Sequence, residues 1–171
     1  MTRKIMMLSM LLTVLGIGWA LVYGTPAGAA GNPSATGHID ILDSSGALSL
    51  DHYSFSAIQH KDGSVTGQAE ILILPVGGTA ERIHVAVDCL AFFGDTEPMN
   101  IATVGGTVTE VQVGTTPFIV GDHVAFTVMD VGEGGDSPPD EGSPVTLVGD
   151  CPQLDTFPSE RGNVQVRPPA L

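Results

Sequence analysis

Short runs of alternating apolar and polar residues, separated by turns rich in glycine and proline, constrain this sequence most. After residue 36, no segment shows apolar residues at i, i+3, i+4 and i+7 over three turns, as an amphipathic helix would require. With 22 Gly and 12 Pro among 171 residues, turns should be frequent and long helices are not expected. The pattern therefore predicts an all-β domain.

About eight runs have the composition of strands. They span residues 37–42, 47–59, 65–74, 82–92, 101–113, 123–131, 144–148 and 163–166. Between the second and third runs, Lys61-Asp62-Gly63 predicts a tight hairpin turn, because Gly63 readily adopts positive φ. Most of the runs follow one another through short connections, which favours antiparallel pairing.

Two details of the strands bear on the architecture. In run 82–92, alternation places Cys89 on the inner face with Val87, and Asp88 on the outer face. Gly105-Gly106 inside run 101–113 predicts a bulge or a sharp bend of the kind that curls a sheet. Because an exposed sheet edge invites aggregation, we expect a small antiparallel β-barrel, with a two-sheet β-sandwich as the alternative.

The N-terminus has the organisation of a signal peptide. Arg3 and Lys4 precede the uncharged stretch 5–23, and Ala27-Gly28-Ala29 supplies an A-x-A cleavage site. The alternative is an uncleaved membrane anchor, since 19 apolar residues can span a bilayer. We therefore expect a helical signal peptide at 1–30, a flexible segment at 31–36, the β-domain at 37–166 and a tail at 167–171. The mature protein would be secreted, periplasmic or held in the cell envelope.

The sequence contains two cysteines, Cys89 and Cys151, and both lie after the signal peptide. An even number of cysteines in an exported chain favours a disulfide. The pair would close a loop of roughly 60 residues, and its role would be structural. Two free buried thiols are the alternative.

The charge of the chain excludes several partners. After cleavage, four basic residues would remain against 19 acidic ones, a net charge of −15. Such a surface repels the phosphate backbone of nucleic acids and the anionic face of a membrane. The sequence therefore predicts no nucleic-acid binding, and no membrane association after cleavage.

The acidic loop 130–143 is the most conspicuous candidate site. Its carboxylates Asp130, Glu133, Asp136 and Asp140 lie among glycines and prolines, and calcium prefers oxygen ligands from a flexible loop. The spacing is not that of an EF-hand. The alternative is a solvated loop in which Asp140 hydrogen-bonds backbone amides. Calcium is the one cofactor that the sequence suggests.

Other chemistry has little support in the sequence. His52, His84 and His123 lie on three predicted strands and would form a metal site only if they converged inside a barrel. No G-x-S-x-G motif is present, and the thiols are expected to be oxidised. We expect a non-enzymatic module that binds a small ligand or a protein. The alternatives are a calcium-stabilised module and a hydrolase that uses paired carboxylates.

Six short phrases occur in order along the chain: residues 53–57 (YSFSA), 62–68 (DGSVTGQ), 87–90 (VDCL), 128–134 (VMDVGEG), 138–140 (PPD) and 162–166 (GNVQV). Together they resemble a group of small secreted bacterial proteins of unassigned function. The resemblance covers most of residues 37–166. In that group an Asn follows the Asp of the D-x-G-E-G phrase, whereas this chain has Val131, which removes one oxygen ligand. The resemblance implies export and a shared β fold, and no activity.

Overall fold

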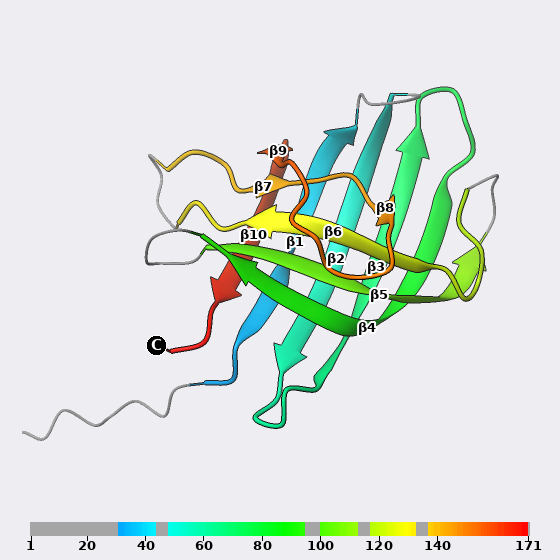
Figure 1. Cartoon of the computed structure of the whole chain (residues 1–171). Helices are drawn as coiled ribbons and strands as arrows, with labels where there is room; N and C mark the ends of the chain where they lie inside the picture. Colours follow the sequence, from blue (N-terminus) through cyan, green and yellow to red (C-terminus); the bar gives the residue numbers. More distant parts are fainter. Residues whose placement is uncertain (1–30, 44–47, 95–99, 113–116, 133–136, 171) are drawn as a thin grey trace, which may run out of the picture. The chain divides into compact units, whose positions relative to one another are not determined.

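The computed structural model describes residues 31–43, 48–94, 100–112, 117–132 and 137–170. These residues form one antiparallel sheet of ten strands in the order β10-β1-β2-β3-β4-β5-β6-β7-β9, with β8 paired to β6 (Figure 1). The strands are β1 (Ser34–Asp43), β2 (Ser49–Gln59), β3 (Val65–Pro75), β4 (Glu81–Phe93), β5 (Ile101–Gln112), β6 (His123–Met129), β7 (Glu141–Gly142), β8 (Thr146–Leu147), β9 (Phe157–Pro158) and β10 (Arg161–Arg167). The all-β prediction is confirmed. The backbone ladder of these residues does not close into the barrel that we expected.

The predicted strands all have counterparts in the structure, while the two-residue strands β7 and β9 were not expected. The hairpin between β2 and β3 turns at Gly63, whose φ is 84°, and the His60 amide donates to the Ser64 carbonyl. The described residues include no helix that is long and apolar enough to cross a membrane. The expected signal helix lies outside the described residues.

The sheet folds back on itself through the long strands β4 and β5. Strand β4 pairs with β3 only as far as Val87, and its remainder up to Phe93 pairs only with β5. Strands β1–β3 and the first part of β4 thus form one layer, and β5–β6 with the second part of β4 cross it as another (Figure 1). The inner faces of these two layers enclose the core.

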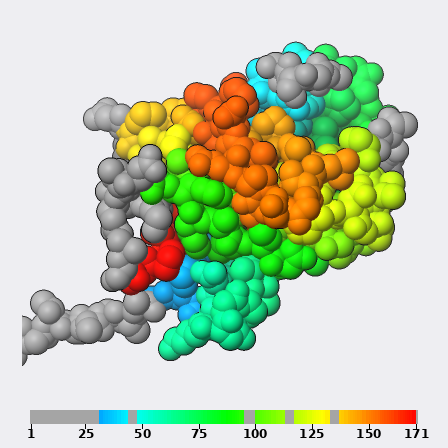
Figure 2. All heavy atoms as spheres, in the orientation of Figure 1, coloured from blue at the N-terminus to red at the C-terminus, as the bar shows by residue number. Residues whose placement is uncertain are grey.

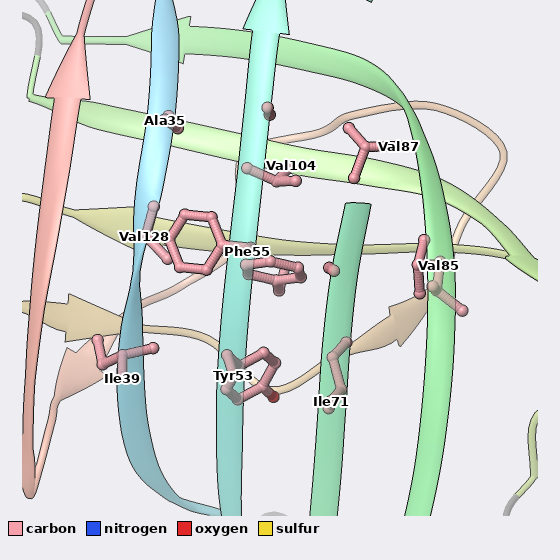
Figure 3. Close-up of a cluster of buried hydrophobic side chains, with 14 of the residues drawn as sticks. Ala35, Ile39, Tyr53, Phe55, Ile71, Val85, Val87, Val104 and Val128 are labelled. Carbon is pink, nitrogen blue, oxygen red and sulfur yellow. The ribbon is translucent and has the colours of Figure 1, made fainter. Parts of the chain in front are cut away.

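The core consists of buried aliphatic and aromatic side chains from both layers. Tyr53 and Phe55 of β2 meet Phe126 of β6, with ring centroids 5.0 and 5.2 Å apart. Figure 3 shows Ile39, Tyr53, Phe55, Ile71 and Val85 pointing toward side chains of the other layer. Every hydrophobic residue of this cluster is at most 7% exposed. Close packing of this kind makes the burial of apolar surface the main stabilising contribution.

A β-bulge at Asp88 changes which face of the sheet the following residues of β4 point to. Val87 pairs with Gly106 and Cys89 with Gly105, so Asp88 is an extra residue in the ladder. Because of this insertion Leu90, rather than Cys89, returns to the buried cluster. The prediction that Cys89 faces inward is therefore wrong. The irregularity lies opposite Gly105-Gly106, on β4, and not within β5 where a bulge or bend was expected. Gly106 is required here because a Cβ would lie 2.1 Å from the Ala86 carbonyl oxygen.

The free edge of β10 is covered by side chains of the loop between β6 and β7. The carboxylate of Asp140 accepts the amide of Val164 at 2.7 Å, and Asp130 accepts that of Val166 at 3.1 Å. Strand β10 pairs with β1 along its other edge. Two aspartates thus satisfy donors that a neighbouring strand would otherwise satisfy, which protects an edge that would be prone to aggregate.

A segment that we call the strap, residues 143–156, covers the outer face of β5 and β6. The hydroxyls of Thr103 and Thr127 hydrogen-bond each other beneath it at 2.7 Å, and both are fully buried. Thr103 also donates to the Pro152 carbonyl, and Leu154 donates its amide to Thr127. Figure 2 shows the strap in orange against the green strands.

The disulfide between Cys89 and Cys151 fixes the strap to β4. The two Cα atoms are 6.2 Å apart, and the residues are separated by 62 positions in the sequence. A Cβ at Gly105 would lie 3.0 Å from the Cys151 sulfur, so this glycine makes room for the bond. The predicted pairing is confirmed. Because of the bulge, however, the bond lies on the outer face of the sheet.

Candidate functional site

The interior between the two layers is filled by side chains, including a small polar network at one end. The carboxylate of Asp51 is 2% exposed and accepts the Ser49 hydroxyl at 2.8 Å. The Tyr53 hydroxyl lies 3.4 Å from Asp51 and accepts the Val145 amide at 3.0 Å. Burial raises the pKa of Asp51 above the ordinary value of 3.8, although the bond from Ser49 opposes this shift. The network connects β2 to the strap.

Replacing Asp51 by asparagine should raise the melting temperature at pH 7 by a few degrees. The folded-state pKa is raised, so Asp51 favours folding fully only below pH 3.8 and loses that contribution as the pH rises through the folded-state pKa. Asparagine removes the buried charge and still offers an oxygen to Ser49. Thermal unfolding between pH 3 and 8 should show the advantage shrinking as the pH falls. The exposed control Asp155→Asn should show no such trend, and a less stable Asp51→Asn protein at pH 7 would contradict the argument.

The three strand histidines lie on different parts of the outer face and do not converge. His52 hydrogen-bonds Asp40, His84 lies 3.7 Å from Glu70, and the Nε2 atom of His123 lies 3.0 Å from Asp88. Among the described residues, no group of three or more His, Cys, Asp or Glu side chains is placed to hold a metal ion. The condition for a three-histidine site inside the sheet is therefore not met.

Asp40 joins β1, β2 and β10 on this outer face. Its side chain accepts hydrogen bonds from His52 and from the guanidinium of Arg161. Burial raises the pKa of Asp40, but the bonds from Arg161 and His52 together outweigh burial, so the pKa lies below its ordinary value. Each of its oxygens has a partner within this network, so Asp40 contributes to the structure and is poorly placed to bind a ligand.

A half-open hollow of about 620 Å³ lies on the outer face of β2–β5. Its polar lining consists of Ser54, Gln68, Glu70, His84, Thr109 and Glu110. The register of the sheet assembles this set, because Ser54 pairs with Glu70, Glu70 with His84, and His84 with Glu110. Ala86 lies among these longer side chains, and its small size helps to leave the space open.

A second irregularity in β5 shapes the rim of the hollow. His84 pairs with Glu110 but Val85 pairs with Val108, so Thr109 is an extra residue. Thr109 and Glu110 are consequently both exposed, whereas Val108 is buried. The Thr109 hydroxyl donates to the His84 carbonyl at 3.2 Å, which holds the irregularity in place. Bulges commonly redirect side chains at binding sites, and this one brings a carboxylate and a hydroxyl to the same hollow.

The charged groups of the hollow are two carboxylates, Glu70 and Glu110, and the His84 ring lies between them in the sheet. Glu70 lies 3.6 Å from the Nε atom of Arg82 and 3.7 Å from the Nε2 atom of His84. Both distances are beyond a normal hydrogen bond, so the carboxylate of Glu70 remains open to a further donor. Glu110 accepts the side-chain amide of Gln112 at 2.7 Å through one oxygen. The arrangement offers carboxylate acceptors on strands either side of His84, with neutral hydrogen-bonding groups around them.

Two of the four predicted calcium ligands have other roles. Asp140 is 9% exposed and accepts the amides of Val131 and Val164, and Asp130 accepts those of Gly132 and Val166. This is the alternative that we considered for Asp140. Glu133 and Asp136 lie outside the described residues, so calcium binding by the full loop stays a prediction.

The hollow was not identified from the sequence, although part of its signal is present. The outward positions of β4 are Arg82, His84, Ala86 and Asp88, and a single alanine among longer polar residues indicates a depression. The pairing of Glu70 and Glu110 with His84 depends on the sheet register and on the irregularity at Thr109. Neither can be read from the local sequence pattern. No known protein family, curated protein or solved structure matches this chain.

Proposed function

We propose that this chain is an exported, non-enzymatic binding module that engages its ligand or partner through the hollow on the outer face of β2–β5. The observation that carries this proposal is the contrast between the two faces of the sheet. The inner face is packed with side chains that are nearly unexposed, whereas the outer face of β2–β5 carries a hollow with six polar groups. Pockets with a few convergent polar groups are the usual location of ligand sites.

Export is supported by the sequence of residues 1–30 and by the disulfide. The A-x-A site after an uncharged stretch favours cleavage and release. A structural disulfide between Cys89 and Cys151 is typical of proteins that fold in an oxidising compartment. This part of the proposal rests on these two features.

Binding is favoured over carboxylate-based hydrolysis at this site. Hydrolysis by two carboxylates needs one of them protonated near neutral pH, which proteins usually achieve by burying that acid. The side chain of Glu70 is 42% exposed, and Glu110 is exposed as well. Water can solvate both charges, which suits the recognition of a ligand better than proton transfer to one.

Filling the hollow should weaken binding at least tenfold without harming the fold. Ala86→Met adds a long apolar side chain at an exposed strand position, so stability should change by no more than about 0.5 kcal/mol. We expect a screen of cationic, anionic and neutral small molecules, followed by amide chemical shifts, to give at least one binder that perturbs Gln68, Ala86 and Glu110. Affinity for that binder should fall at least tenfold in the variant.

The control for this experiment is Gln165→Met, which makes a similar change on the exposed strand β10, away from the hollow. It should bind as the wild type does. The proposed function is wrong if no class of small molecule perturbs the hollow, or if the binders found are insensitive to Ala86→Met.

A further inference from the structure

We infer that the hollow recognises a cationic nitrogen group, an amine or a guanidinium, held between Glu70 and Glu110. This inference rests on the proposed function and specifies its ligand chemistry. Glu70 lies on β3 and Glu110 on β5, and each is the direct cross-strand neighbour of His84 on β4. Two carboxylates therefore flank one half-open space of about 620 Å³.

The present partners of Glu70 leave it able to accept a ligand donor. Arg82 and His84 approach at 3.6 and 3.7 Å, which is close enough for attraction but too far for a good hydrogen bond. An ammonium or guanidinium group that entered the hollow could donate at normal distance and form a charge-assisted bond. Glu110 accepts the side-chain amide of Gln112 through its Oε1 atom, and the residue lines the hollow.

The neutral lining suits the same kind of group. Ser54, Gln68 and Thr109 provide hydroxyl and amide oxygens, which accept hydrogen bonds from the remaining N–H donors of a cation. Ala86 and the backbone around Gly67 leave space for the alkyl carbons that carry the charged group. His84 can donate or accept, depending on which ring nitrogen is protonated.

The net charge of the whole chain also favours a cationic ligand. With a net charge of −15 after removal of residues 1–30, the protein attracts cations and repels anions. Such a field raises the association rate of a cationic ligand at low ionic strength. The same field disfavours the phosphorylated or carboxylated ligands that a pocket of this size could otherwise hold.

Three probes with the same five-carbon spacing separate charge from shape: cadaverine, 1,5-pentanediol and glutarate. Titration of the mature protein at low salt, followed by amide chemical shifts, should show cadaverine binding at the hollow while the diol and the diacid do not. Glu70→Gln and Glu110→Gln should each weaken cadaverine about fivefold, the upper range for a partly exposed ion pair. Together they should weaken it at least tenfold.

Glu160→Gln is the matched control, because it removes one exposed carboxylate elsewhere on the chain. Its effect should be less than twofold. An equal loss in Glu160→Gln and Glu70→Gln would show that only bulk charge attracts the probe, and would overturn the inference. Binding of the diol or diacid at the hollow as tightly as cadaverine would also overturn it, but would leave the proposed binding function standing.

N-acetyl-lysine methylamide identifies the source of the cationic group. If it binds as well as cadaverine with the same dependence on Glu70 and Glu110, a lysine side chain of a protein partner fits the hollow. If cadaverine binds and the lysine derivative does not, the ligand is a free amine. Both results support recognition of a cationic nitrogen, and failure of both probes overturns it.

Discussion

Replacing both Cys89 and Cys151 by serine should lower the free energy of unfolding by about 4 kcal/mol, because the disulfide closes a long loop in the unfolded chain. The residues are separated by 62 positions, and loop closure costs more entropy as the loop grows. Urea denaturation of the wild type and of the double variant measures the difference directly. It is the largest effect that we expect from any pair of substitutions on the outer face of the sheet.

Reduction of the wild-type protein provides the matched control for this prediction. Dithiothreitol should destabilise the wild type by a similar amount and leave the double variant unchanged. After reduction, amide hydrogen exchange should accelerate first in the strap. The Val148 and Leu154 amides report this, because both donate hydrogen bonds to residues of β6. A loss below about 1 kcal/mol would mean that the strap is held mainly by its hydrogen bonds, contrary to the chain-entropy argument.

Replacing Asp140 by alanine should cost about 3 kcal/mol or more, since it leaves two backbone donors without their acceptor. The Asp140 carboxylate is 9% exposed and accepts the amides of Val131 at 2.9 Å and Val164 at 2.7 Å. Hydrogen bonds to a charged acceptor are stronger than neutral ones. Chemical denaturation gives the size of the loss, and exchange of the Val164 amide should accelerate.

Asp155→Ala is the control, because Asp155 is an exposed acid on the strap and its replacement should change stability by less than about 0.5 kcal/mol. Repeating the denaturation and amide-exchange measurements in EDTA distinguishes the two roles considered for Asp140, which are the capping of backbone amides and the binding of calcium. A cost that persists in EDTA supports the amide-capping role. A cost that appears only with added calcium would instead support the predicted metal site and contradict the capping argument.

The strands could be predicted because the residues within each strand and the turns beside it specify its extent. Alternating apolar residues, interrupted by turns such as the one at Gly63, specify where the chain is extended and which face is buried. The prediction failed at Cys89, where both Cys89 and Leu90 are apolar enough to be buried. Only the extra residue at Asp88 decides between them, and that insertion depends on how β4 fits against β5.

The candidate site was harder to predict for the same reason. Glu70, His84 and Glu110 are 14 and 26 residues apart in the sequence, and the register of three strands brings them into one row. In the acidic loop, the carboxylates are only three or four residues apart in the sequence, which is what suggested a metal site. In the structure, Asp130 and Asp140 serve backbone donors of a strand more than twenty residues later. Proximity in sequence alone does not reveal these roles of Asp130 and Asp140.

The pairing of β1 with β10 has a consequence for how the domain responds to mechanical force. Ser34 lies opposite Arg167, so the two ends of the β-domain leave it side by side and in opposite chain directions. A load applied between those ends would separate the pairs of β1 and β10 one after another, beginning at Ser34, instead of shearing many hydrogen bonds at once. Such unzipping yields at low force, and it would detach β10 while the disulfide still held the strap on β4.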